Sequence, residues 1–200
     1  MTVYKIAGRG YGCNSYILTS DNKTAVVIDC ADEKVYSECE KRGLKPVAVL
    51  LTHGHFDHVG GCGLFYSKNV PIYCGEKERE YIFSEENRSV FGGVYIPKFD
   101  ICEGLKDKEK VTFGGITFEI ISTPGHTAGG VCYLAEDCLF SGDTLFLGSV
   151  GRCDLPGGNF SELKNSLKKL LSIDRNLKVY CGHGENTTLD YERKHNPYIN

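Results

Sequence analysis

The segment Thr52–His58, which reads THGHFDH, constrains the fold of this 200-residue chain more than any other. Its three histidines and one aspartate directly follow the apolar run PVAVLL. Imidazole and carboxylate groups are the ligands that zinc, iron and manganese accept in proteins. Because side chains alternate along an extended backbone, His53 and His55 point to one side, and a turn then brings Asp57 and His58 nearby. We therefore predict a strand that ends in a loop able to supply ligands to two metal ions.

Three further segments each place one potential ligand in a glycine-rich stretch. Glycine beside a ligand lets the backbone approach closely and adopt positive φ. The remaining histidine, His195, has no such context and is predicted to lie on the surface of a helix. The three segments are TPGHTAGG with His126, SGDTLF with Asp143, and CGHG with His183.

The order of predicted elements indicates an α+β fold with two similar halves. Each half runs through strands, then a helix, then a strand, which favours two mixed sheets packed face to face with helices outside. The length suits one domain that covers residues 1–200. The segment 84–109 contains a glycine pair and a proline and is predicted to be irregular and mobile.

Apolar periodicity, turn residues and capping residues predict the individual elements. One helix is expected to begin at Asp32 and end before Gly43, and Asn159 is expected to cap another. A hairpin is expected to turn at Gly114-Gly115. Predicted strands cover 2–7, 14–20, 24–30, 46–52, 70–75, 110–123, 131–137, 138–143 and 177–182, and shorter predicted helices cover 59–68, 76–83 and 189–195.

Composition excludes several classes of partner. The net charge is -3 and 24% of residues are charged, which argues against nucleic acid and membrane surfaces as partners. The chain has no apolar run long enough for a signal peptide or a membrane span, so the cytoplasm is the expected location. None of the ten cysteines has CxxC spacing, and we expect reduced, mostly buried thiols.

The segments HGHFDHVGG, TPGHTAGG, GDTLF, GRCDLPGG and GHGENT, in this order, resemble the metallo-β-lactamase superfamily. Within it the chain is most similar to glyoxalase II-like hydrolases (hydroxyacylglutathione hydrolases) of the short, single-domain kind. The resemblance implies an αββα sandwich with the metals at one edge of the two sheets. It assigns His53, His55 and His126 to the first metal, Asp57, His58 and His183 to the second, and Asp143 to both.

The resemblance implies a metal-dependent hydrolase of thioesters such as S-D-lactoylglutathione. A hydroxide bridging two divalent ions would attack the carbonyl, with Asp57 orienting it. Zinc is the expected metal, and iron or manganese also fits these ligands. Arg152 lies where relatives hold a glutathione carboxylate, or else it pairs with Asp154. Secreted zinc β-lactamases usually have a cysteine at the position of Asp143, which argues against antibiotic hydrolysis.

Other functions are compatible with parts of the pattern. A mononuclear-iron persulfide dioxygenase of the same superfamily needs two histidines and one carboxylate, and such relatives keep the HxHxDH motif. The GHGENT segment favours the hydrolase instead. A non-catalytic member would have lost a ligand, and a nuclease would have a large additional domain. Thr52, Thr127 and Thr144 lie beside ligands and are candidates for holding the imidazoles in place.

Overall fold

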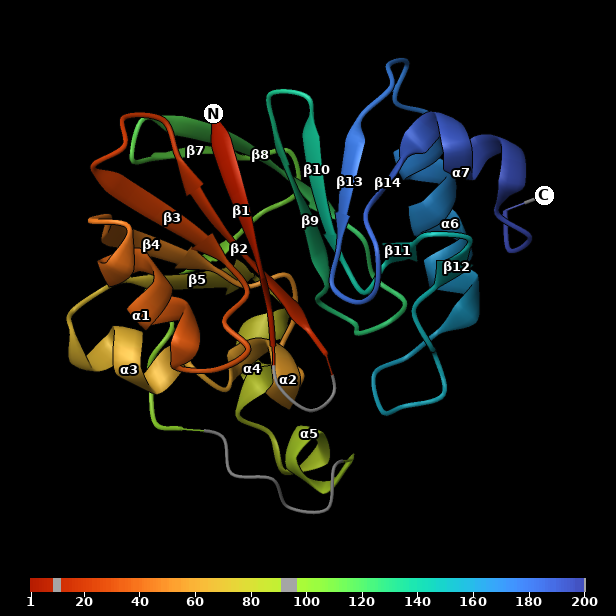
Figure 1. The fold of residues 1–200 in the computed structure, drawn as a ribbon. Coiled ribbons are helices and arrows are strands. Elements are labelled where there is room, and N and C mark those ends of the chain that lie inside the picture. The colour runs from red at the N-terminus through yellow and green to blue at the C-terminus, as the bar shows by residue number, and fades with distance from the viewer. Residues whose placement is uncertain (9–11, 91–96, 200) are drawn as a thin grey trace.

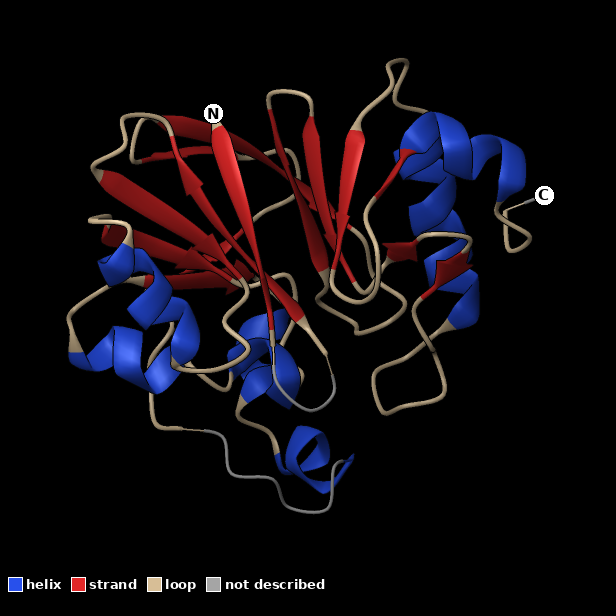
Figure 2. Cartoon of the chain, viewed as in Figure 1, coloured by secondary structure: helices blue, strands red, loops and turns tan. Residues whose placement is uncertain are grey.

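The computed structural model describes residues 1–8, 12–90 and 97–199. Two six-stranded sheets lie face to face, and helices cover the outer face of each (Figures 1 and 2). This is the αββα sandwich of mixed sheets that the sequence predicts.

The strands of the first sheet follow the order of the chain. The pairs β1–β2 and β2–β3 are antiparallel, whereas β3, β4, β5 and β6 are mutually parallel. Parallel neighbours require crossover connections, and helices lie between them in the sequence. The elements are β1 (Thr2–Ala7), β2 (Asn14–Thr19), β3 (Thr24–Ile28), α1 (Lys34–Lys41), β4 (Lys45–Leu50), α2 (Phe56–Val59), α3 (Cys62–Ser67), β5 (Ile72–Gly75), α4 (Glu78–Ile82), α5 (Glu85–Val90) and β6 (Glu103–Leu105).

The second sheet has the strand order β14-β13-β10-β9-β8-β7. Only the pair β10–β13 is parallel among these described strands, and helix α6 lies in the crossover between them. A separate two-stranded sheet pairs β11 with β12. The elements are β7 (Lys110–Phe113), β8 (Ile116–Ser122), β9 (Val131–Ala135), β10 (Cys138–Gly142), β11 (Leu145–Phe146), β12 (Ser149–Val150), α6 (Phe160–Leu171), β13 (Lys178–Cys181), β14 (Thr187–Thr188) and α7 (Leu189–His195).

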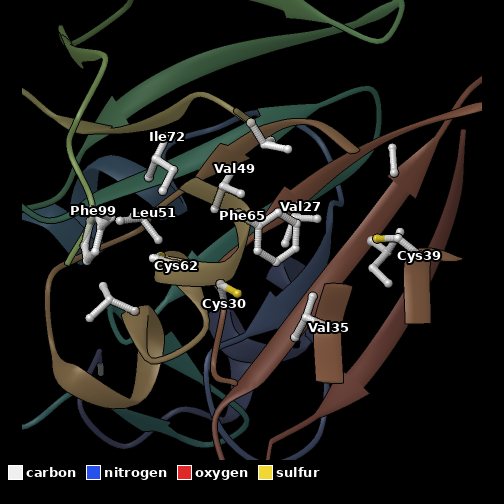
Figure 3. Close-up of a cluster of buried hydrophobic side chains, with 14 of the residues drawn as sticks. Val27, Cys30, Val35, Cys39, Val49, Leu51, Cys62, Phe65, Ile72 and Phe99 are labelled. Atoms are coloured by element: carbon white, nitrogen blue, oxygen red, sulfur yellow. The ribbon is translucent and has the colours of Figure 1, made fainter. Parts of the chain in front are cut away.

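Three apolar clusters hold the layers together. One joins the first sheet to its outer helices (Figure 3), one fills the space between the sheets, and one joins the second sheet to α6 and α7. Neighbouring residues of β4 divide between two clusters: Val49 packs outward and Leu50 packs inward. This alternation follows from the pleat of a strand that is covered on both faces, as the apolar run predicts.

Several predicted details are confirmed. The hairpin of β7 and β8 turns at Gly114-Gly115, where both residues have positive φ. Gly43 follows α1 with φ of 65°. His195 is exposed at the end of α7. The start of α1 differs from the expectation, because the helix begins two residues after Asp32, whose carboxylate accepts a hydrogen bond from the backbone of Lys34.

The short helix predicted at 59–68 is present as α3, and a separate helix of one turn, α2, comes before it. One expectation was wrong: the segment 84–109 contains α5 and β6 and is not irregular throughout. Within this segment the ring of Phe99 is buried against that of Phe83, and Tyr95 lies outside the described residues.

The cysteines agree with the expectation of buried thiols. All ten lie in the described ranges and are free, and eight of them are buried. No helix in the described ranges combines the length and the apolar character needed to cross a bilayer.

The cap of α6 gives a first test of the fold. The Asn159 side-chain oxygen accepts hydrogen bonds from the backbone of Ser161 at 2.9 Å and Glu162 at 3.1 Å. We expect Asn159→Ala to lower the free energy of unfolding by about 1 kcal/mol in urea denaturation, since two backbone donors lose their partner. Lys164→Ala, on the exposed face of the same helix, serves as the control. Equal stability of the two variants would contradict this role of Asn159.

Candidate metal centre

The predicted ligands follow strands that belong to both sheets. The HGHFDH loop comes after β4 of the first sheet, whereas His126, Asp143 and His183 come after β8, β10 and β13 of the second. Backbone hydrogen bonds join these loops: Val131 donates to Thr52 at 2.9 Å. The structure therefore brings all seven predicted ligands to one edge of the sandwich.

The first group contains His53, His55 and His126, all buried. One nitrogen from each lies within 4.8 Å of the other two. The closest pair is Nε2 of His126 and Nδ1 of His55, which are 2.9 Å apart. Three imidazole nitrogens that converge in this way match the ligand set of a zinc or iron site.

The second group contains Asp57, His58 and His183. The carboxylate of Asp57 lies 3.2 Å from Nε2 of His183 and 3.9 Å from Nε2 of His58. This group is more open than the first, because the side chain of His183 is 29% exposed whereas that of His58 is fully buried. Solvent therefore reaches the centre from the side of His183.

Asp143 lies between the two groups. Its Oδ1 is 3.3 Å from Nε2 of His58, and its Oδ2 is 3.5 Å from Nε2 of His126 and 3.4 Å from Nε2 of His183. A residue larger than glycine at position 182 would displace this carboxylate, because a β-carbon there would lie 2.1 Å from Oδ1. One carboxylate thus faces both groups.

Buried atoms without hydrogen-bond partners show that these residues fit metal ions. Nε2 of His53, Nε2 of His58 and Oδ1 of Asp143 are buried and make no hydrogen bond within the described chain. Each such atom costs about 1–3 kcal/mol when nothing compensates it. A cation coordinated by these atoms would remove that cost.

Comparisons with known proteins identify the family. The sequence model of the metallo-beta-lactamase superfamily matches residues 8–183. The chain belongs to the metallo-β-lactamase superfamily. Among relatives, it is 32% identical to the hydroxyacylglutathione hydrolase GloC of Haemophilus influenzae, over 94% of this chain and 92% of GloC.

Two solved structures show how closely the fold is shared within the superfamily. The BLEG-1 B3 metallo-beta-lactamase superposes with a TM-score of 0.93 at 34% identity, covering 99% of each chain. TTHA1623 in a di-iron-bound form superposes with a TM-score of 0.81 at 33% identity, covering 98% of this chain and 99% of that one. The second of these shows that a relative with this fold holds two metal ions.

Neighbouring groups set the orientation of the imidazoles at this superfamily centre. Nδ1 of His126 donates to the carbonyl of Arg152 at 2.7 Å, which leaves Nε2 as the ligand atom. Nε2 of His55 faces the Tyr81 hydroxyl at 3.4 Å, and that hydroxyl donates to Pro156. The lone pair of His126 Nε2 therefore faces the lone pair of His55 Nδ1. A cation bound between these two nitrogens would remove their mutual repulsion.

Asp29 fixes two further imidazoles, those of His58 and His53, and sequence reasoning missed it. Its Oδ2 accepts from Nδ1 of His58 at 2.9 Å and from the hydroxyl of Thr52 at 2.8 Å. That hydroxyl then accepts from Nδ1 of His53 at 3.1 Å. A signal was present, because Asp29 is a carboxylate that directly follows the apolar strand β3.

The three threonines beside ligands have different roles. Thr52 contacts His53, as expected. The hydroxyl of Thr127 donates instead to Glu78 at 2.9 Å, and that of Thr144 donates to Thr123 at 3.1 Å. Only the first therefore orients an imidazole through a hydrogen bond seen in the described residues.

Electrostatics differ between the two groups. Burial and the neighbouring imidazoles hold the pKa of His53 well below its usual value and lower that of His55 to about 3. Burial also acts on His183, but hydrogen bonds to Asp143 and Asp57 raise its pKa to about 9. Since a metal binds neutral imidazole, His53 and His55 are ready for an ion at neutral pH, whereas binding at His183 displaces a proton.

Glu78, on α4, ties two ligand loops together, and sequence reasoning missed this role too. Its Oε1 accepts from the backbone of Gly54 at 2.8 Å, and its Oε2 accepts from the Thr127 hydroxyl at 2.9 Å and the Gly129 backbone at 3.0 Å. The side chain is completely buried. One carboxylate thus joins the loop of His53 and His55 to the loop of His126.

Arg152 lies near the centre, but its side chain points elsewhere. The guanidinium makes two hydrogen bonds of 2.7 Å to Asp154, which is the alternative that the sequence left open. It lines a surface hollow of about 500 Å³ together with the exposed rings of Phe160 and Tyr198. Its backbone carbonyl is what contacts the centre, through His126.

The role of Asp29 can be tested by metal affinity. We expect Asp29→Asn to weaken binding of the metal by about 10–100-fold, because the amide no longer holds the His58 imidazole as a carboxylate does. The measurement is competition with a chromophoric chelator. Asp174→Asn, at an exposed position, is the control. An unchanged affinity in Asp29→Asn would show that the imidazole is held by other contacts.

Glu78 predicts a pH dependence of stability. Burial raises the pKa of Glu78 from 4.5 to about 7, against three hydrogen bonds that lower it. Because the folded pKa is the higher one, the stability that this carboxyl contributes is present below pH 4.5 and lost as the pH rises to about 7. At about 1.4 kcal/mol per pKa unit, the loss is on the order of 3 kcal/mol.

The measurement compares metal-free wild type with metal-free Glu78→Gln in urea at several pH values. The glutamine is neutral throughout, and other titrating groups cancel in the difference between the two proteins. We expect the wild type to lose stability relative to the variant over this pH range. A difference that stays constant with pH would refute the raised pKa.

Proposed function

We propose that this chain is a metal-dependent hydrolase that uses two divalent ions to cleave thioesters such as S-D-lactoylglutathione. The position of Asp143 between two ligand groups supports this most directly. The three buried atoms without partners support it as well. Zinc is the metal we favour, and the di-iron form of TTHA1623 makes iron the first alternative.

In this proposal, His53, His55 and His126 hold the first ion, Asp57, His58 and His183 hold the second, and Asp143 contacts both. When bound, such ions lower the pKa of a coordinated water to about 7 and polarise the substrate carbonyl. Asp29, Thr52 and the carbonyl of Arg152 hold the imidazoles so that no reorganisation is needed during the reaction.

Asp57 is suited to orient the nucleophile. Burial disfavours its ionised form, but His58 and His183 hold the pKa of Asp57 below its usual value. At neutral pH its carboxylate is therefore an acceptor for the proton of the attacking water. Its side chain is 16% exposed, next to the open side of the centre, where a substrate would arrive.

A thioester is the substrate class that suits this site. The leaving thiolate has an ordinary pKa near about 8.5, so its departure needs no strong general acid. The similarity to the GloC hydroxyacylglutathione hydrolase points to the same class. Arg152 would release Asp154 and bind a carboxylate of the thiol carrier instead, since the side chains of Arg152 and Asp154 are both largely exposed.

The cysteines bear on the location of this activity. With ten free cysteines, the chain suits a reducing compartment, and we place the activity in the cytoplasm.

Two other activities are outcomes that the assays must distinguish. The similarity to the BLEG-1 B3 metallo-beta-lactamase favours β-lactam hydrolysis as a second candidate, contrary to the argument from Asp143. A mononuclear-iron persulfide dioxygenase uses two histidines and one carboxylate, which His53, His55, His126 and Asp143 would supply, and it leaves the second group without a role. Thioester, β-lactam and persulfide substrates should therefore be assayed side by side, with metal content and oxygen uptake.

The hydrolase proposal makes a direct prediction for His126. We expect His126→Ala to lose bound metal and thioesterase activity together, with turnover reduced by more than about 100-fold, because the first group keeps only two imidazoles. His195→Ala, which removes an exposed histidine of α7, is the matched control and should retain both. Metal would be measured by elemental analysis after gel filtration.

Full activity in His126→Ala would refute this assignment of the ligand. One iron per wild-type chain, with oxygen consumed on glutathione persulfide and no thioester cleavage, would replace the proposal with the dioxygenase. Faster cleavage of a β-lactam than of any thioester would favour the second candidate.

A further inference from the structure

Cys13 lies beside the second ligand group, although sequence reasoning treated it as an ordinary buried thiol. It directly precedes β2 and is 1% exposed. Its sulfur and one donor atom each of Asp57 and His58 all lie within 4.8 Å of one another. A sulfur donor is therefore available where the second metal would bind.

The other buried cysteines have a packing role that Cys13 lacks. Seven of the eight buried cysteines belong to the three apolar clusters of the sandwich. Cys13 is in none of them. Its thiol makes a long hydrogen bond, 3.6 Å, to the carbonyl of the next residue, and it also interacts with the imidazole of His58. Apolar packing accounts for the burial of those seven cysteines, whereas the burial of Cys13 needs another explanation.

His58 supplies an independent indication that a cation binds here. Its imidazole is completely buried, and Nδ1 is occupied by Asp29. Nε2 has no hydrogen-bond partner among the described residues and lies 3.9 Å from the carboxylate of Asp57. The free nitrogen and this carboxylate thus mark the position of an ion within reach of the Cys13 sulfur.

We propose that the thiolate of Cys13 is an additional ligand of the second metal ion. The thiol proton passes to solvent when the ion binds, since thiolate is the form that coordinates metals. A sulfur ligand makes this site softer than one of imidazole and carboxylate alone, which favours zinc or cobalt over manganese. The inference depends on the proposed two-metal centre and not on the identity of the substrate.

Cobalt(II) is the probe for this ligand, because cobalt–thiolate bonds give an intense near-ultraviolet charge-transfer absorption. The full-length wild type, Cys13→Ala and Cys39→Ala would be titrated with cobalt, with bound metal quantified in each. Cys39 is the matched control because it is equally buried, in the apolar cluster of Figure 3. We expect the band in wild type and Cys39→Ala and its loss in Cys13→Ala.

Affinity gives a second readout that does not require turnover. We expect Cys13→Ala to bind the second zinc ion about 10–100-fold more weakly than wild type, with a smaller change for manganese. X-ray absorption of zinc-loaded wild type tests the same point without any variant. It should show a sulfur neighbour at about 2.3 Å from zinc.

The outcomes separate this inference from the hydrolase proposal. Two bound metals, active thioesterase and no sulfur neighbour would overturn the role of Cys13 and leave the hydrolase intact. A charge-transfer band that persists in Cys13→Ala would also overturn it, since another cysteine would then be the ligand. A sulfur neighbour in a protein that cleaves no thioester would support Cys13 and count against the proposed substrate.

Discussion

The buried carboxylate of Asp143 is the constraint on which the rest of the centre depends. Burial disfavours its charge, but His58, His183 and His126 hold the pKa of Asp143 well below its usual value. An ionised carboxylate in such a place must be surrounded by positive or polarisable groups on every side. Imidazoles from both sheets meet this requirement, and a cation on each side of the carboxylate would meet it more fully.

The two sheets must therefore be fixed against each other close to this point. Hydrogen bonds join the start of β2 in the first sheet to the C-terminal end of β13 in the second: the Tyr16 hydroxyl donates to Cys181 at 2.6 Å, and the backbone of Asn14 donates to Gly182 at 2.6 Å. The hydroxyl of Tyr133 donates to Leu51 at 2.7 Å, next to the histidine loop. The apolar cluster between the sheets adds the bulk of the attraction, while these contacts set the register of the ligand loops.

The positions of the ligands could be predicted because each ligand loop directly follows a strand. The local sequence is therefore enough to locate these residues at the edge of a sheet. The contacts of Asp29 and Glu78 could not, because their partners lie 23 or more residues away and depend on how the sheets pack. Strand β6 was missed for a related reason: it has three residues, including Gly104, and gains its structure from pairing with β5. The side chain of Arg152 could have either of two partners in sequence, and only packing shows that Asp154 is within reach.

The two ligand groups differ in burial, and this difference suits them to different roles. The first group is enclosed, and its imidazoles are held by Thr52, Tyr81 and a backbone carbonyl, so it is suited to retain an ion. The second group borders solvent at His183 and Asp57, where charge is balanced by protons until a metal replaces them. A substrate carbonyl can approach only where the ligands are open. In the proposed two-metal hydrolase, the reaction would therefore take place on the side of the second group, and Asp57, His58 and His183 would have the greatest influence on it.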